Sequence, residues 1–248
     1  MIAGQRVLIV LPVRLGSTRL PQKAILSKTG KPLVVHAADR AAKSKYADQV
    51  VIAGDHNDIK NAVEPYGFEY IPTGGHHTSG SSRCSEVLNK LNADIVVNVQ
   101  GDEPEVDPDH VDAVIGAMTD SSVKCSTLAC PLDPEDQSNP NVVKVAIACT
   151  GAALYFSRSL IPFDRDHIGA KHWRHVGLYA YRPDTLREFC QMRQSPLEQT
   201  EQLEQLRLLE HGIPIHVVTH HEPSPPGVDT MEQYEAFVGR WLRNHPTC

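Results

Sequence analysis

Val7-Leu-Ile-Val-Leu11 is a continuous apolar run, and Pro12-Val-Arg-Leu-Gly-Ser-Thr-Arg-Leu-Pro-Gln-Lys23 follows it directly. An unbroken apolar run is typical of a strand that is buried on both faces of a parallel sheet. The loop after such a strand lies at the carboxyl edge of the sheet, where open α/β sheets bind their ligands. The stretch therefore predicts an α/β fold with a binding loop at residues 12–23.

This loop carries three cations within ten residues, Arg14, Arg19 and Lys23. Arginine forms fork-like contacts with phosphate oxygens, whereas lysine acts as a point charge. The small residues 16–18 allow backbone N–H groups to converge on an anion. The composition fits a phosphate-binding loop and a solvated basic loop equally well. The loop lacks G-x-G-x-x-G, which weighs against a nicotinamide oxidoreductase, and it lacks a Walker A motif.

Strand and helix patterns alternate through the first half of the chain. Further strands are predicted at 50–53, 68–71 and 95–99, and helices at 32–41, 59–64, 81–91 (with Ser81 as N-cap) and 108–118. Such β-α repetition predicts a doubly wound parallel sheet with right-handed crossovers.

The second half departs from this alternation. Strands are predicted at 142–149 and 152–156, as an antiparallel pair with its turn at Thr150-Gly151, and at 176–181 and 213–218; helices are predicted at 200–209 and 231–244. No long linker rich in Pro, Gly or Ser separates the halves. We therefore expect one domain across residues 1–248, with a mixed, mainly parallel sheet and an elaborated antiparallel second half.

Bulk properties narrow the class of protein. The formal net charge of −6 argues against broad nucleic-acid binding, which needs a basic face. No apolar stretch is long enough to cross a bilayer, and residues 1–6 lead directly into a strand, without the apolar segment of a secretory signal. The six cysteines show no C-x-x-C pair. We expect a cytoplasmic protein without membrane or nucleic-acid partners.

Two acidic positions are candidates for metal ligands. Asp102 follows the strand at 95–99, in Gln100-Gly-Asp-Glu-Pro104, and Asp229 stands in Gly227-Val-Asp-Thr230. Mg²⁺ prefers oxygen ligands, often one or two carboxylates completed by phosphate oxygens and water. A lone acid at such a place more often caps a turn, and the sequence does not show whether the two meet.

Polar segments of the second half suit an acidic sugar. They supply guanidinium, imidazole, phenol, carboxylate and amide groups, in Tyr155-Phe-Ser-Arg158, Ile161-Pro-Phe-Asp-Arg165, Arg174-His-Val-Gly-Leu-Tyr179 and Gln199-Thr-Glu-Gln-Leu-Glu-Gln205. Ordinary surface charge, with leucines packed inward, accounts for most of these residues equally well.

An ordered set of motifs along nearly the whole chain resembles the bacterial 3-deoxy-manno-octulosonate (Kdo) cytidylyltransferases, or CMP-Kdo synthetases. The matching stretches are Arg14…Ser17-Thr-Arg-Leu-Pro…Lys23, Gly30-Lys-Pro, Thr78-Ser-Gly80, Val97-Asn-Val-Gln-Gly-Asp-Glu-Pro104, Asn141…Val143-Lys-Val, Tyr155-Phe-Ser-Arg158, Ile161-Pro162, Arg174-His175, Ser195-Pro-Leu-Glu198, Leu203-Glu-Gln-Leu-Arg207 and Gly227-Val-Asp-Thr230. The N-terminal loop occurs in many sugar nucleotidyltransferases, whereas the ordered set is specific.

The resemblance implies a Rossmann-like nucleotidyltransferase fold. Residues 1–130 would mainly bind CTP, and residues 131–230 would mainly bind the sugar and form a homodimer. The implied reaction transfers CMP from CTP to Kdo with Mg²⁺ and releases pyrophosphate, for lipopolysaccharide biosynthesis.

Site residues are carried over from the matching motifs. The implied CTP-binding residues are Arg14, Ser17, Thr18, Lys23, Thr78, Ser79, Gly80, Arg83 and Asp102. The implied sugar-binding residues are Gln100, Arg158, Arg165, His175, Tyr179, Glu201 and Gln205. The implied metal ligands are Asp102 and Asp229, which with Arg14 and Lys23 form the expected catalytic set. The chain departs from the family pattern at Ser82, where the family has an acid, at Gln22, and in the short region 166–173.

Other activities stay open at this stage. A related acidic sugar, either sialic acid or 8-amino-Kdo, could replace Kdo. For 8-amino-Kdo the reason is that a single residue can recognise one amino group. A nucleotide-binding protein without catalytic activity is the alternative from another class. The acids and loop cations that this chain keeps weigh against that alternative.

Overall fold

The computed structural model describes residues 1–17 and 19–245. Thr18, one of the expected CTP-binding residues, therefore lies outside the described residues. The chain forms two compact units, one from residues 1–111 with the segment that begins at residue 225, and the other from residues 112–224. The assignment of CTP binding to residues 1–130 and sugar binding to residues 131–230 stays a prediction.

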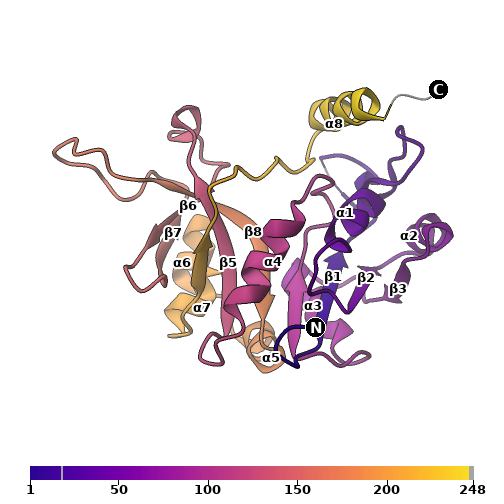
Figure 1. Cartoon of the computed structure of the whole chain (residues 1–248), viewed down its shortest axis with the longest axis horizontal. Coiled ribbons are helices and arrows are strands. Elements are labelled where there is room, and N and C mark those ends of the chain that lie inside the picture. The colour runs from indigo at the N-terminus through magenta and orange to yellow at the C-terminus, as the bar shows by residue number, and fades with distance from the viewer. Residues whose placement is uncertain (18, 246–248) are drawn as a thin grey trace. The chain divides into compact units, whose positions relative to one another are not determined.

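The first unit contains a parallel sheet with strand order β3-β2-β1-β4 (Figure 1). Its strands are β1 (Val7–Pro12), β2 (Gln49–Gly54), β3 (Glu69–Pro72) and β4 (Ile95–Asn98). Every residue of β1 is buried, with Ile9 in register with Val50 on one side and Val97 on the other. The predicted parallel sheet is confirmed, and β1 is a fully buried inner strand.

Helices alternate with these strands as the sequence predicted. They are α1 (Leu33–Ala41), α2 (Asn57–Val63), α3 (Gly80–Val87) and α4 (Pro108–Ala117), with the short 3-10 helices η1 (Lys23–Ile25) and η2 (Glu64–Tyr66). The closing helix α8 (Met231–Asn244) has the predicted bounds and begins with a capping box of Thr230 and Gln233. It buries Tyr234 and Phe237 in a cluster with Leu33.

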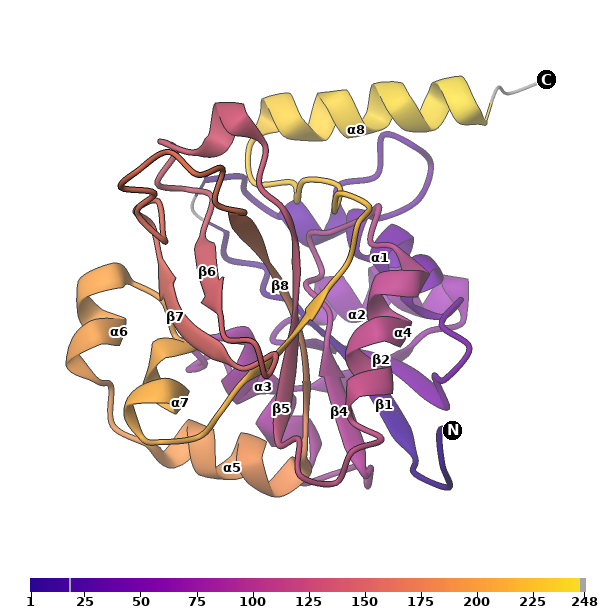
Figure 2. The ribbon, with the colours of Figure 1, turned by 60° about the vertical axis from the view of Figure 1, so that its left-hand side comes forward.

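The second unit is mixed, with antiparallel pairing dominant. Its elements are β5 (Cys125–Pro131), β6 (Lys144–Ile147), β7 (Ala153–Ser157), β8 (Trp173–Tyr181), β9 (His216–Thr219), α5 (Pro183–Gln191), α6 (Pro196–Glu201), α7 (Leu206–Glu210) and the 3-10 helix η3 (Pro134–Asp136). β5 pairs antiparallel with β8 and parallel with β9, and β6 pairs antiparallel with β7 and β8. Figure 2 shows α6 and α7 beside β7. The predicted antiparallel second half is confirmed.

Two sequence predictions of elements need correction, and two elements were not predicted. The N-cap of α3 is Ser79, which accepts a hydrogen bond from the Ser82 N–H, and not Ser81. The single helix predicted at 200–209 is two helices, because Gln202 adopts a left-handed conformation (φ 53°) that ends α6. The sequence also missed β5 and α5. Among the described residues, no helix is both long and apolar enough to span a membrane.

Candidate active site

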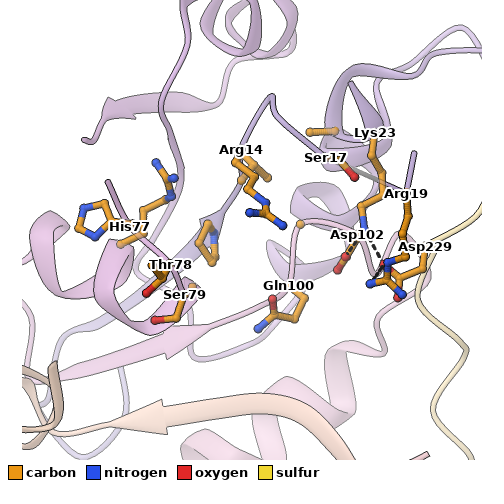
Figure 3. A pocket seen from close by; sticks show the side chains of 16 residues that line it. Arg14, Ser17, Arg19, Lys23, His77, Thr78, Ser79, Gln100, Asp102 and Asp229 are labelled. Carbon is orange, nitrogen blue, oxygen red and sulfur yellow. Dashed lines mark hydrogen bonds and ion pairs between the residues drawn. The ribbon is translucent and has the colours of Figure 1, made fainter. Parts of the chain in front are cut away.

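A pocket of about 250 Å³ lies in the first unit, at the carboxyl ends of β1 and β4 (Figure 3). It is lined by every implied CTP-binding and metal-binding residue that the structure describes, namely Arg14, Ser17, Lys23, Thr78, Ser79, Gly80, Arg83, Asp102 and Asp229. Of the implied sugar-binding residues, Gln100 also lines it. The pocket is therefore where open α/β sheets bind ligands.

Lys23 joins the two candidate metal ligands. Its Nζ lies 2.5 Å from Oδ2 of Asp102 and 2.9 Å from Oδ1 of Asp229, which Arg19 also contacts at 3.0 Å (Figure 3). Burial by itself lowers the pKa of Lys23, but the ion pairs with both acids outweigh that effect and raise the pKa above its ordinary value. The ammonium therefore stays charged at neutral pH.

Backbone contacts bring the two acids together from distant parts of the sequence. The N–H of Val228 donates to the carbonyl of Asp102 at 2.8 Å, and the N–H of Asp229 donates to the Gln233 side chain at 2.7 Å. Gly101 allows the loop after β4 to pass close to β1, since a Cβ there would lie 2.3 Å from Cγ1 of Val13. The loops that carry the two acids are therefore also held by contacts that do not involve the carboxylates of Asp102 and Asp229.

The converging carboxylates are suited to a divalent cation. Oxygen atoms from two carboxylates already bond one cationic nitrogen, and carboxylate oxygens are the ligands that Mg²⁺ prefers in proteins. Asp102 and Asp229 keep 33% and 40% of their side-chain surface exposed, which leaves room for phosphate oxygens or water. The donor set therefore fits Mg²⁺.

A second group of possible metal ligands consists of His76, His77 and Glu86, of which His77 lines the pocket. Nε2 of His77 lies 2.5 Å from Oε2 of Glu86. A metal about 2.0–2.2 Å from each ligand atom would need more space between them. This group is therefore a hydrogen-bonded His–Glu pair with an exposed histidine beside it.

The amino end of α3 forms the other side of the pocket, opposite Lys23 and the two acids in Figure 3. The hydroxyl of Ser82 donates to the carbonyl of Ser79 and lies 3.1 Å from Nδ1 of His77. The backbone and side chains of Thr78 and Ser79 offer neutral hydrogen-bonding groups beside the pocket. This arrangement suits a polar, uncharged group such as a nucleobase or ribose.

Arg83 lines the pocket, yet its guanidinium forms hydrogen bonds with other groups of the protein. It is 3% exposed and donates to Asp55 at 3.1 Å, to the Thr73 hydroxyl and to the carbonyl of Gly74. Sequence reasoning missed His77 and Asp55 in this region. An acid directly after the strand at 50–53 was the available signal for Asp55.

The remaining implied sugar-binding residues all belong to the second unit. Arg158 donates to the carbonyls of Pro140, Glu201 and Gln202, and its own N–H donates to the Glu201 carboxylate. Arg165, by contrast, is 88% exposed and contacts Asp166 at 3.9 Å. Its guanidinium is much more accessible to an external anion.

His175 and Tyr179 lie close together on β8, with ring centroids 5.4 Å apart. Burial, with a smaller contribution from the charge of Arg174, lowers the pKa of His175 to about 3. Burial raises the pKa of Tyr179 well above its ordinary value. Both side chains are therefore neutral at physiological pH, and Gln205 is buried in the same unit.

Known proteins resemble this chain over nearly its whole length. The cytidylyltransferase family model matches residues 8–215. The 3-deoxy-manno-octulosonate cytidylyltransferase of Neisseria gonorrhoeae (strain NCCP11945) is 43% identical over 240 residues, which cover 92% of this chain and 94% of that protein. The corresponding protein of Chlorobium limicola is 42% identical, covering 95% and 96%.

Solved structures agree with the sequence comparisons. A structure of CMP:2-keto-3-deoxy-manno-octonic acid synthetase complexed with CTP has a TM-score of 0.93 and 38% identity, covering 96% of this chain and 99% of that one. The 4-diphosphocytidyl-2C-methyl-D-erythritol synthase of Anaerococcus prevotii shares the fold alone, with a TM-score of 0.65 and 15% identity over 98% of each chain. Taken with the pocket and its ordered motifs, these likenesses show that the chain belongs to the 3-deoxy-manno-octulosonate cytidylyltransferase family of nucleotidyltransferases.

Proposed function

We propose that this chain transfers CMP from CTP to Kdo and releases pyrophosphate. The observation that carries the proposal is the convergence of Lys23, Asp102 and Asp229 on one point of a pocket that Arg14 also lines. The pocket thus combines cations that can bind phosphates, acids that can bind a metal, and neutral hydrogen-bonding groups at the start of α3 that suit a base or ribose. The relatives that match over more than nine tenths of the chain are named for this same activity.

The proposed reaction is an in-line substitution at the α-phosphorus of CTP. The anomeric hydroxyl of Kdo forms the new P–O bond, the bond to the β-phosphate oxygen breaks, and the hydroxyl proton leaves to solvent. Arg14 and Lys23 bind the triphosphate and neutralise the charge that accumulates on pyrophosphate. Positioning and charge neutralisation account for most of the catalysis in such transfers.

Asp102 and Asp229 would hold Mg²⁺. When bound there, Mg²⁺ supplies Lewis-acid stabilisation of charge on the phosphate oxygens and on the attacking hydroxyl. Lys23 bonds both acids in this structure, so binding Mg²⁺ between the acids would require Lys23 to exchange them for the phosphates of the nucleotide.

On the sugar side, we propose that Arg165 binds the carboxylate of Kdo. Its exposed guanidinium supports this role, whereas Arg158 has its donors engaged with backbone carbonyls. Gln100, His175, Tyr179, Glu201 and Gln205 remain proposed members of the sugar-binding set. For the neutral His175 and Tyr179 the proposed role is hydrogen bonding, without proton transfer.

Charge-removing variants of the two acids test the proposed site. Asp102→Asn and Asp229→Asn should retain the wild-type circular dichroism spectrum and lose several orders of magnitude in the rate of pyrophosphate release. Asp39→Asn is the matched control, because Asp39 is also ion-paired with a lysine and is 39% exposed, yet it does not line the pocket. Near-normal rates in either pocket variant would show that its acid is only structural.

A homodimer and a cytoplasmic location complete the proposal. The large apolar side chains of Leu154, Phe163 and Ile168 are 64–85% exposed in the second unit, and burial of such side chains by a second copy would be favourable. Light scattering on a size-exclusion column should give twice the 27.3 kDa mass of the chain. A monomeric mass at micromolar concentration would refute the dimer.

A further inference from the structure

The carboxylate of Asp55 bridges two segments that each contribute residues to the pocket lining. Asp55 directly follows β2, which ends at Gly54. Its Oδ1 accepts the N–H of Leu15 at 3.1 Å, and its Oδ2 accepts Nη2 of Arg83, also at 3.1 Å. Leu15 belongs to the basic loop, and Arg83 belongs to α3.

Both contacts act on neighbouring residues that line the pocket. Leu15 directly follows Arg14, so the position of its N–H restricts the backbone from which the Arg14 side chain extends. Arg83 lies one turn into α3, whose first residue Gly80 lines the pocket together with Thr78 and Ser79. Asp55 itself is not among the lining residues.

The ion pair between Asp55 and Arg83 is largely shielded from water and is held by further hydrogen bonds. The side chain of Arg83 is 4% exposed and that of Asp55 is 16% exposed, so water does little to screen their charges. Arg83 also donates to the hydroxyl of Thr73, which in turn donates to the carbonyl of Gly54 at 3.0 Å. The guanidinium is thereby fixed against the carboxyl ends of β2 and β3.

We propose that Asp55 is a positioning residue that fixes the basic loop and the start of α3 at the spacing that CTP requires. The inference rests on the proposed function for the identity of the nucleotide. Asp55 touches neither the phosphates nor the base in this account. It acts through Leu15 and Arg83, and its loss loosens the basic loop and the start of α3 together.

Asp48, at the other end of β2, provides a matched control. Its Oδ2 accepts the N–H of Val7 at 2.8 Å, and its Oδ1 pairs with the N-terminal ammonium at 2.9 Å. Asp48 and Asp55 thus each bind one backbone N–H at or beside β1 and one cation. Asp48 does so at the amino end of the sheet, away from the pocket.

The test compares Asp55→Asn with Asp48→Asn. Asparagine has one side-chain oxygen in place of two and carries no charge. It therefore cannot accept hydrogen bonds from both Leu15 and Arg83 with separate oxygens, and it cannot form an ion pair with Arg83. We expect the dissociation constant of CTP, measured by calorimetry without sugar, and the KM for CTP to rise about tenfold or more. We expect kcat to change less than about threefold and the KM for Kdo less than about twofold. Asp48→Asn should lower the melting temperature and leave CTP binding within about twofold of wild type.

Hydrogen exchange gives a readout that does not depend on the nucleotide. In Asp55→Asn the amides of residues 13–17 should exchange faster than in wild type, while in Asp48→Asn they should not. If Asp55→Asn does not fold, Thr73→Val removes one acceptor of Arg83 without unpairing its charge and should weaken CTP binding about threefold. If Asp55→Asn shows the faster exchange but the wild-type protein shows no turnover, the proposed function is refuted. The inference that Asp55 bridges the two segments then still stands.

The inference fails under either of two results. The first is wild-type CTP affinity in a folded Asp55→Asn protein, which would show that the bridge does not set the spacing between the basic loop and α3. If Asp55→Asn does not fold, wild-type CTP affinity in folded Thr73→Val would show the same. The second is equal loss of CTP affinity in Asp48→Asn, which would show that general destabilisation, and not the position of Asp55, weakens binding.

Discussion

Lys23→Ala should change metal binding and catalysis in opposite directions. The substitution removes the Nζ that bonds Asp102 at 2.5 Å and Asp229 at 2.9 Å. In the absence of nucleotide this ammonium competes with a metal for the same two carboxylates. With nucleotide bound, the same ammonium would bind phosphate oxygens and assist the leaving group.

The magnitudes follow from the exposure of the groups. Ion pairs with solvent-exposed partners contribute about 0.2–1 kcal/mol each, so displacing Lys23 from both acids costs a metal about 0.4–2 kcal/mol. Its removal should therefore tighten metal binding by about 2- to 30-fold. Losing a desolvated cation from a phosphate contact costs about 2–5 kcal/mol, which corresponds to a fall of about 30- to 5,000-fold in kcat/KM for CTP.

Two assays separate the effects. Titration with Mn²⁺ without nucleotide, in which electron paramagnetic resonance counts the free ion, gives the metal affinity. Pyrophosphate release gives kcat/KM. Lys31→Ala is the control, because Lys31 pairs with Asp39 at 2.5 Å outside the pocket, and both readouts should stay at wild-type values. Weaker Mn²⁺ binding in Lys23→Ala would refute the competition and show that Lys23 instead orders the two acids.

Three further predictions concern stability, the sugar and the base. Burial, reinforced by the charge of Lys31, lowers the pKa of His36 to about 4. Between this pKa and the value of about 6.5 in the unfolded chain, the unfolded state binds a proton that the folded state does not. The free energy of unfolding should therefore fall as pH drops from 6.5 to 4, by about 2 kcal/mol at pH 5. Urea titration checks this, and an unchanged pH dependence in His36→Leu would contradict it. Arg165→Ala should raise the KM for Kdo far more than that for CTP, whereas Arg158→Ala should chiefly lower the melting temperature. A large rise in the KM for Kdo in Arg158→Ala, with only a lower melting temperature in Arg165→Ala, would show that Arg158 binds the sugar instead. CTP should be turned over far better than ATP or GTP, since a pocket that pairs hydrogen bonds with one base leaves buried groups unpaired with another, and comparable rates would contradict a cytosine site.

In the first half, β1, β2 and β4 were predictable because each contains a nearly continuous apolar run. β5 was not, because Cys125-Ser-Thr-Leu-Ala-Cys-Pro131 buries two hydroxyls whose partners lie elsewhere in the fold: the Ser126 hydroxyl donates to the carbonyl of Val114 and the Thr127 hydroxyl to that of Leu178. Periodicity detects apolar faces and cannot detect polar groups that tertiary contacts satisfy.

The helix predicted at 200–209 was wrong for a local reason. Leucines at helical spacing continue past residue 202, but the left-handed conformation of Gln202 interrupts the helix. Ser79 and Ser81 are both good capping residues, and only the path of the chain decides that Ser79 forms the cap.

The candidate site was predictable as separate loops and not as an arrangement. The meeting of Asp102 with Asp229 depends on a main-chain bond between Val228 and Asp102 that no local pattern encodes. The resemblance assigned Arg83 to CTP, but its burial against Asp55 could be seen only in the fold. Residue type indicated the chemistry, and tertiary geometry decided which donors remain accessible.

The central claim, CMP transfer to Kdo, is tested most directly by pyrophosphate release with CTP, Mg²⁺ and a panel of Kdo, 8-amino-Kdo and sialic acid. The account predicts turnover with Kdo that stops in excess EDTA, with kcat/KM for Kdo at least about tenfold above that for either other sugar. No release with Kdo, or a clear preference for 8-amino-Kdo or sialic acid, would contradict it.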